Sequence, residues 1–132
     1  MGLAKSFVRL AKKLPIDLAQ AELNETTKGK LIALDLVPRL AEAKRGSQTA
    51  LDVGCRAGNQ TRWLENIGYM VTSVDVEKTF DKCVVVDADK RLPLDDNSFD
   101  LVWCSEVIEH FLNPAFSTAE IRRVLKKGGR IY

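Results

Sequence analysis

The sequence predicts an α/β fold with a doubly wound, mostly parallel sheet, and three observations lead to it. Short apolar runs alternate with helix-like segments from residue 49 to residue 132. The apolar run 50–53 stops at Gly54, and Gly58 follows before residues that can open a helix. The connections between successive runs are short, so we expect parallel strands that bind ligands at their carboxyl ends.

Length, charge and cysteine content narrow the class of protein. The 132 residues, 45% of them hydrophobic and 29% charged, fit a single soluble domain. Residues 1–45 carry nine Lys or Arg against five Asp or Glu, whereas residues 75–109 carry four against ten. The acidic stretch would repel nucleic acid, so we expect no such partner. Three cysteines without CxxC spacing argue against a disulfide framework or a metal site, and for a cytoplasmic location.

The first 45 residues are expected to form an N-terminal helical extension, and residues 46–132 the domain that holds the sheet. Apolar residues at helical spacing predict a basic amphipathic helix over 3–14. That helix either packs on its own domain or contacts a membrane surface or a partner. Helical structure is expected to continue over 17–23, and a further helix over 26–44 should bend or split at Pro38.

The pattern in residues 46–132 also predicts element bounds. We expect strands at 50–53, 70–75, 83–86 and 101–104, a fifth strand from Arg130, and helices at 60–67 and 114–127. Asn113 and Pro114 predict the start of the second helix, and Gly128 with Gly129 its end. The inward side chains of the two helices should be Trp63, Leu64, Ile67, Phe116, Ile121, Val124 and Leu125.

An acidic residue ends the second predicted strand. Asp75 lies about 20 residues beyond the glycine turn, where nucleotide-binding α/β folds place a carboxylate that accepts ribose hydroxyls. Only a short turn separates Asp75 from the strand that starts at Cys83, so this crossover is abbreviated. The combination of glycine turn and strand-end carboxylate predicts a site for a nucleoside-bearing ligand.

Several motifs, in this order and spacing, extend the match. They are residues 51–58, 74–75, 87–88, 92–94, 97–102, 109–110 and 122–130. Together they resemble the class I S-adenosylmethionine-dependent methyltransferases, in particular the small-molecule, methyltransferase type 11-like subgroup that includes ubiquinone, sugar and lipid methyltransferases. The resemblance implies a Rossmann-like fold, S-adenosyl-L-methionine as cofactor and a small metabolite, glycan or lipid intermediate as methyl acceptor.

The resemblance also implies roles for individual residues. The methionine part of the cofactor would lie in the turn, the ribose at Asp75 and the adenine at Asp87. The implied cofactor-binding residues are Asp52, Gly54, Cys55, Gly58, Asp75, Val76, Asp87, Ala88, Ser105 and Glu106. If the acceptor must lose a proton, His110 or Glu109 could act as its base, the alternative being that His110 is structural.

Three features depart from the family pattern, and the abbreviated crossover after Asp75 is the first. Arg56 stands where the family usually has glycine, so the turn must accommodate a long cationic side chain. The sequence stops at Tyr132, where the fifth strand begins, so we expect a sheet truncated at its C-terminal side.

The truncated sheet leads to alternative readings. An open sheet edge suggests a homodimer or a partner subunit. The main alternative function is therefore a catalytically silent methyltransferase-like subunit that binds a partner. A nicotinamide dehydrogenase is disfavoured because the turn lacks the three-glycine spacing.

Overall fold

The computed structural model describes residues 35–38 and 47–132. The chain divides into two units, Met1–Ala43 and Lys44–Tyr132, which are treated separately. The helices predicted over 3–14 and 17–23 lie outside the described residues, as does most of the helix predicted over 26–44, of which 35–38 are helical. The domain boundary after residue 45 stays a prediction. Within the described part, no helix is long and apolar enough to cross a membrane.

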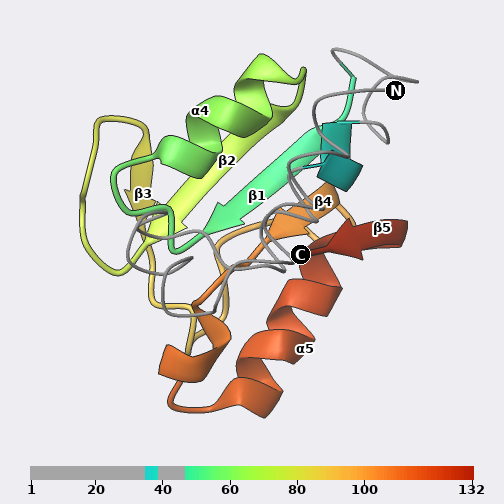
Figure 1. The fold of residues 1–132 in the computed structure, drawn as a ribbon. Helices are drawn as coiled ribbons and strands as arrows, with labels where there is room; N and C mark the ends of the chain where they lie inside the picture. Colours follow the sequence, from blue (N-terminus) through green and yellow to red (C-terminus); the bar gives the residue numbers. More distant parts are fainter. Residues whose placement is uncertain (1–34, 39–46) are drawn as a thin grey trace, which may run out of the picture. The chain divides into compact units, whose positions relative to one another are not determined.

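The second unit is built on a five-stranded parallel sheet with the order β3-β2-β1-β4-β5 (Figure 1). The strands are β1 (Thr49–Val53), β2 (Met70–Asp75), β3 (Cys83–Val85), β4 (Phe99–Trp103) and β5 (Leu125–Ile131). The chain runs from β1 outward to β3 and then returns to the other side of β1 with β4. This reversal confirms the predicted α/β class and creates a switch point at the carboxyl ends of β1 and β4.

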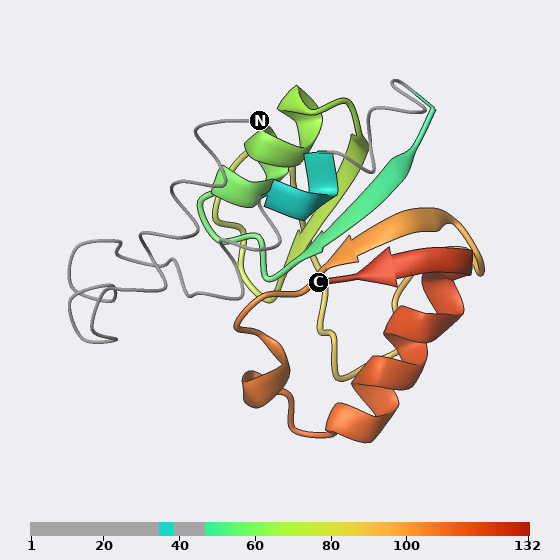
Figure 2. The ribbon, with the colours of Figure 1, turned by 45° about the vertical axis from the view of Figure 1, so that its right-hand side comes forward.

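Helices α4 (Asn59–Asn66) and α5 (Pro114–Val124) pack on opposite faces of the sheet, as Figures 1 and 2 show. On one face, Trp63 of α4 meets Trp103 of β4 edge to face, with ring centroids 5.4 Å apart. On the other face, Ile121 and Val124 of α5 join the apolar cluster of the sheet. Because side chains alternate along a strand, neighbouring residues of β1 point their side chains to opposite faces of the sheet.

The main core lies between the sheet and α5. Its buried members are Leu51, Val53, Val74, Val86, Leu92, Phe99, Val102, Cys104, Ile121 and Val124. Removing these apolar side chains from water is the main favourable contribution to folding of this unit. The predicted inward positions of Ile121 and Val124 are thereby confirmed.

The C-terminal helix ends earlier than predicted, and the fifth strand begins at Leu125 rather than Arg130. The N–H groups of Asn97 and Ser98 donate to the carbonyls of Arg123 and Val124 and so occupy the helix end. Leu125 is extended and pairs with Phe99, and a register shift accommodates the glycine-containing stretch before β5 pairs again at Arg130. Strand pairing therefore overrides the helical pattern of Leu125 to Lys127.

The first turn of α5 also departs from the prediction. The cap is confirmed, because the Asn113 side chain accepts a hydrogen bond from the N–H of Phe116 at 3.2 Å. The side chain of Phe116, predicted to point inward, is instead 39% exposed. Ser117 is buried instead, and its buried hydroxyl is satisfied because it donates to the Asp89 carboxylate.

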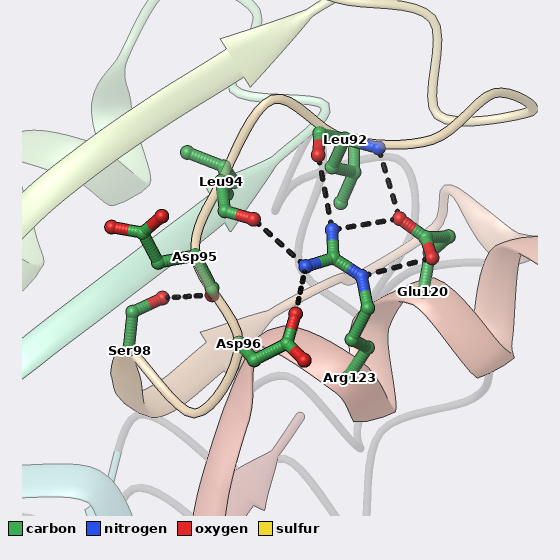
Figure 3. Close-up of polar contacts among 7 residues, drawn as sticks. All are labelled: Leu92, Leu94, Asp95, Asp96, Ser98, Glu120 and Arg123. Carbon is green, nitrogen blue, oxygen red and sulfur yellow. Dashed lines mark hydrogen bonds and ion pairs between the residues drawn. The ribbon is translucent and has the colours of Figure 1, made fainter.

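Arg123 fastens the loop before β4 to α5 (Figure 3). Its guanidinium donates to the carbonyls of Leu92 and Leu94 and to the carboxylates of Asp96 and Glu120. The second oxygen of Glu120 also accepts the N–H of Leu92 at 3.0 Å. These hydrogen bonds raise the pKa of Arg123 and lower that of Glu120, chiefly through their mutual contact.

We predict that Arg123→Met lowers the free energy of unfolding by about 2–3 kcal/mol. The change leaves the largely buried Glu120 carboxylate without its cation and two loop carbonyls without a donor. Urea denaturation followed by circular dichroism measures the loss. Arg122→Met, at an exposed position of the same helix, is the control and should stay within about 0.5 kcal/mol of the wild type. Equal losses for both variants would contradict the fastening role.

The pH dependence gives a second readout of this contact. Because the pKa of Glu120 is lowered in the folded state, its contribution is complete above the unfolded value and disappears as pH falls through the folded value. Stability of the wild type should therefore decrease below about pH 4.3, and Arg123→Met should decrease less steeply there.

Candidate functional site

The turn after β1 carries the chain across the end of β2. Gly54 has φ of +71°, and its N–H and that of Cys55 both donate to the carbonyl of Val74, at 2.9 and 3.2 Å. A Cβ added to Gly54 would lie 2.5 Å from Cγ2 of Val107, in the segment that follows β4. Glycine is therefore required here both by backbone conformation and by the close approach of the two segments.

Asp75 ends β2 with its carboxylate directed at this turn. Its Oδ2 accepts the N–H of Arg56 at 2.9 Å, and its Oδ1 accepts the N–H of Val76 at 2.7 Å. The N–H of Val86, just beyond β3, donates to the Asp75 carbonyl. One residue thus joins the ends of three strands, and each carboxylate oxygen has lone-pair capacity for a further donor.

A cavity of about 220 Å³ opens at the carboxyl ends of these strands. Its walls come from β1 and β2, from the segment after β3, and from η2 (Ile108–His110) with its flanks. The lining residues are Val53, Gly54, Arg56, Val74, Asp75, Val76, Val86, Asp87, Ala88, Asp89, Glu106, Val107, His110 and Phe111. The cavity lies where the strand order reverses, the usual ligand position in such sheets.

The structure brings seven of the twelve predicted site residues to this cavity. These are Gly54, Asp75, Val76, Asp87, Ala88, Glu106 and His110. The other five, which are Asp52, Cys55, Gly58, Ser105 and Glu109, are not among the residues that line it.

Asp52 lies beneath α4, on the face of the sheet opposite the main core. Its side chain is 1% exposed, and its Oδ2 accepts the hydroxyl of Thr61 at 2.6 Å. The Thr61 hydroxyl also lies 2.8 Å from that of Ser73. In this position, the Asp52 carboxylate ties the start of α4 to the sheet.

Cys55 and Gly58 lie inside the turn and away from the cavity. Burial, followed by the contact with Cys83, raises the pKa of Cys55 to about 12, so its thiol stays protonated at neutral pH. Gly58 has φ of +76° and faces the ring of Phe80, which a Cβ there would approach to 2.9 Å. Both residues shape the turn through the backbone.

Sequence reasoning left out several lining residues. Asp89 belongs to the acidic run 87–89 at the end of a strand, and this position could have indicated it. In the structure, its carboxylate accepts the N–H groups of Leu112 and Asn113 and so fixes the start of α5. These backbone donors, first that of Asn113, lower the pKa of Asp89. Val107 and Phe111 follow the fourth strand without a motif, and only the fold places them here.

The lining is acidic, with a single permanent cation among the described residues. Carboxylates come from Asp75, Asp87, Asp89 and Glu106, and the cation is Arg56. The described part of the chain holds no cluster of three side chains suited to a metal ion. Such a cavity favours a cationic organic ligand with groups that can donate hydrogen bonds.

Comparisons with known proteins agree with this geometry. The sequence pattern of a family described as methyltransferase domain matches residues 51–132. Tocopherol O-methyltransferase of Arabidopsis thaliana is 32% identical over 107 residues, covering 68% of this chain and 30% of that protein. The 2-methyl-6-phytyl-1,4-hydroquinone methyltransferase of Synechocystis is 33% identical over 94 residues, covering 61% of this chain and 30% of that protein.

A solved structure extends the likeness to three dimensions. An S-adenosylmethionine dependent methyltransferase from Mesorhizobium loti matches with a TM-score of 0.59 and 25% identity, covering 74% of this chain and 53% of that one. Of the two curated relatives named above, the chain spans 30% of the length of each.

We predict that Gly54→Ala destabilises the fold more than Gly128→Ala does. Both glycines have positive φ, +71° and +81°, so both variants lose about 1–2 kcal/mol to backbone strain. Only the Cβ at position 54 meets a neighbour, since at Gly128 no atom of the described residues lies within 4 Å. Overpacking against Val107 should add about 1–3 kcal/mol, measured by urea denaturation.

A double variant separates the two contributions at Gly54. Adding Val107→Ala to Gly54→Ala removes the methyl group that the new Cβ would meet. It should recover part of the lost stability relative to the sum of the single changes. Equal losses for Gly54→Ala and Gly128→Ala would show that the contact with Val107 does not constrain position 54.

Proposed function

The chain belongs to the methyltransferase domain family, whose cofactor is S-adenosylmethionine, and on this premise we propose that its cavity binds this cofactor for methyl transfer to a small molecule. The observation that supports it most directly is the Asp75 carboxylate, held at the cavity by two backbone N–H groups. The cofactor supplies a methyl group already activated by a sulfonium. The protein then has to bind, align and exclude water.

The residues of the cavity fit the parts of this cofactor. Gly54, where a side chain would fill the space before Val107, leaves the backbone of the turn open to the methionine part. Asp75 would accept the ribose hydroxyls, because its oxygens retain lone pairs, and Val76 lies beside it. Asp87 would accept the adenine amino group, with Ala88 against the ring.

The acidic lining suits the charges of the cofactor. A sulfonium and an ammonium are cationic, and Glu106 stands on the side of η2 where the methionine end would lie. The Asp89 carboxylate is already occupied by two backbone N–H groups and the Ser117 hydroxyl. The Asp87 carboxylate also has partners, the Lys90 ammonium at 3.2 Å on one oxygen and the N–H of Asp89 at 3.0 Å on the other. Each oxygen of Asp75 and Asp87 keeps capacity for a further donor, so these two carboxylates and Glu106 are the ones proposed to contact the cofactor.

For the acceptor, we propose an apolar small molecule with a hydroxyl group on an aromatic ring. Both curated relatives act, by their names, on molecules of this kind, a tocopherol and a phytyl hydroquinone. In this chain, Val107 and Phe111 line the cavity next to His110, and the neighbouring side chains of Ile108 and Leu112 are 38% and 91% exposed. Apolar side chains in the cavity lining and at the positions next to it in sequence favour such an acceptor over a glycan.

A catalytically silent subunit is the second candidate. The outer edge of β5 has no strand partner among the described residues, and Ile131 on it is 46% exposed. Such an edge would suit a partner subunit or a second copy of the chain. A silent subunit would bind the cofactor without turnover, which distinguishes the two candidates.

We also propose a cytoplasmic location for the protein. The three cysteines, which are free and buried, support it.

We predict that S-adenosylhomocysteine binds the wild-type chain and that Asp75→Asn weakens this binding about ten-fold or more. The variant loses the charge that strengthens hydrogen bonds from the ribose hydroxyls. Calorimetric titration measures both affinities. Asp81→Asn, at an exposed position that does not border the cavity, is the matched control and should bind like the wild type.

The outcomes of this titration separate two errors. If the wild-type chain gives no binding heat at millimolar ligand, the proposed cofactor site is wrong. If Asp75→Asn binds as tightly as the wild type, the site stands and Asp75 is removed from it.

We further predict that His110 acts as the base when the acceptor is a phenol. His110 lines the cavity and Glu109 does not, so His110→Gln should lower turnover about 100-fold and Glu109→Gln should leave it unchanged. The assay follows S-adenosylhomocysteine formed from S-adenosylmethionine and hydroquinones that carry apolar chains. Equal turnover in His110→Gln and wild type, at equal cofactor affinity, would leave His110 with a structural role.

A further inference from the structure

The backbone of Arg56 is fixed on both sides. Its φ is +45°, its N–H donates to Oδ2 of Asp75 at 2.9 Å, and its carbonyl accepts the hydroxyl of Thr79. The residue therefore bridges the turn after β1 and the segment after β2. Its Cα is held at the cavity in a conformation that non-glycine residues rarely adopt.

The side chain of Arg56, unlike its backbone, has no hydrogen bond or ion pair with the described residues. Every hydrogen bond that the structure shows for Arg56 uses its backbone, and no ion pair in the described part of the chain includes its guanidinium. Arg62, the nearest arginine in sequence, is different, because its guanidinium donates to Ala57 and Asn59. Arg56 thus places five free N–H donors at the wall of the cavity.

The described lining of the cavity has one permanently cationic side chain, and the proposed cofactor has one anionic group. Of the lining carboxylates, Asp75 and Asp87 are assigned to the ribose and the adenine, and Glu106 to the cationic methionine end. Arg56 is the only permanent cation among the described lining residues. The cofactor has a single anionic group, the carboxylate of its methionine half. A guanidinium binds a carboxylate through two parallel hydrogen bonds, which a point charge such as Lys cannot reproduce.

We propose that Arg56 binds the carboxylate of the cofactor's methionine half and so determines specificity for a cofactor that retains this group. This inference rests on the proposed function. The family usually has glycine at this point of the turn. In this chain, the side chain of Arg56 would instead contact the ligand at the wall of the cavity. It acts in binding and takes no part in the transfer of the methyl group.

The test uses two ligands that differ only in this group, S-adenosylhomocysteine and its decarboxylated analogue. Calorimetric titration of the wild-type chain should show tighter binding of S-adenosylhomocysteine, by about ten-fold or more. Arg56→Gln should lose that preference by weakening S-adenosylhomocysteine alone, with affinity for the analogue unchanged. Arg56→Lys should retain only part of it, since the fork is lost and the charge kept.

Matched variants control for folding and for long-range charge effects. Arg122→Gln removes one positive charge at an exposed position of α5 and should preserve the preference. Arg56→Gly removes the guanidinium but relieves the positive φ, so it should fold at least as well as the wild type in thermal unfolding and still lose the preference.

Each outcome decides the inference. If Arg56→Gln and Arg56→Gly keep the preference, or weaken both ligands equally, Arg56 does not bind the carboxylate and the proposed function stands. Tighter binding of both ligands by Arg56→Gly would show that Arg56 crowds the site, which also overturns the inference. If the wild-type chain binds neither ligand, the proposed function fails together with the inference.

Discussion

The site depends on the way the chain leaves β1. The carbonyl of Val74 accepts two successive N–H groups, from Gly54 and Cys55, so the turn lies across the end of β2. This position brings the N–H of Arg56 to the carboxylate of Asp75 and seats the buried Cys55 beside Cys83 at the start of β3. One peptide carbonyl therefore determines where the turn, the carboxylate and the third strand meet, and a positive φ at Gly54 is the conformational cost.

The two halves of the sheet both contribute to the cavity. The half from β1 to β3 supplies Asp75 and Asp87 together with several apolar residues, and the segment after β4 supplies Glu106, Val107, His110 and Phe111. Behind the paired strands β1 and β4, Val107 lies against Gly54, where an added Cβ would come within 2.5 Å of its Cγ2. Because the strand order reverses at β1, both halves border the same cavity at the switch point, so carboxylates and apolar side chains from each are available to a polar cofactor and a less polar acceptor.

Residues whose role follows from strand position could be predicted from the sequence, and residues whose role follows from packing could not. Asp75 is the last residue of a strand next to a glycine turn, and the structure places it at the cavity. Asp52 is also in a strand, but side chains alternate, so it faces α4 while Val53 borders the cavity. The end of α5 was missed because pairing of Leu125 with Phe99 is a contact distant in sequence, which local periodicity does not contain.

The polar groups around the cavity divide by what already binds them. Asp89 and Asp52 are occupied by groups of the protein, Asp89 by the entry to α5 and Asp52 by Thr61, and so hold the fold. Asp75 is intermediate, since each oxygen has one backbone donor and room for another. Arg56 combines both roles in one residue, with its backbone bound to Asp75 and Thr79 and its guanidinium unpaired in the described structure. Because the fold fixes the backbone of this residue, a ligand of opposite charge has to order only its side chain, at a cost of about 0.5–1.5 kcal/mol.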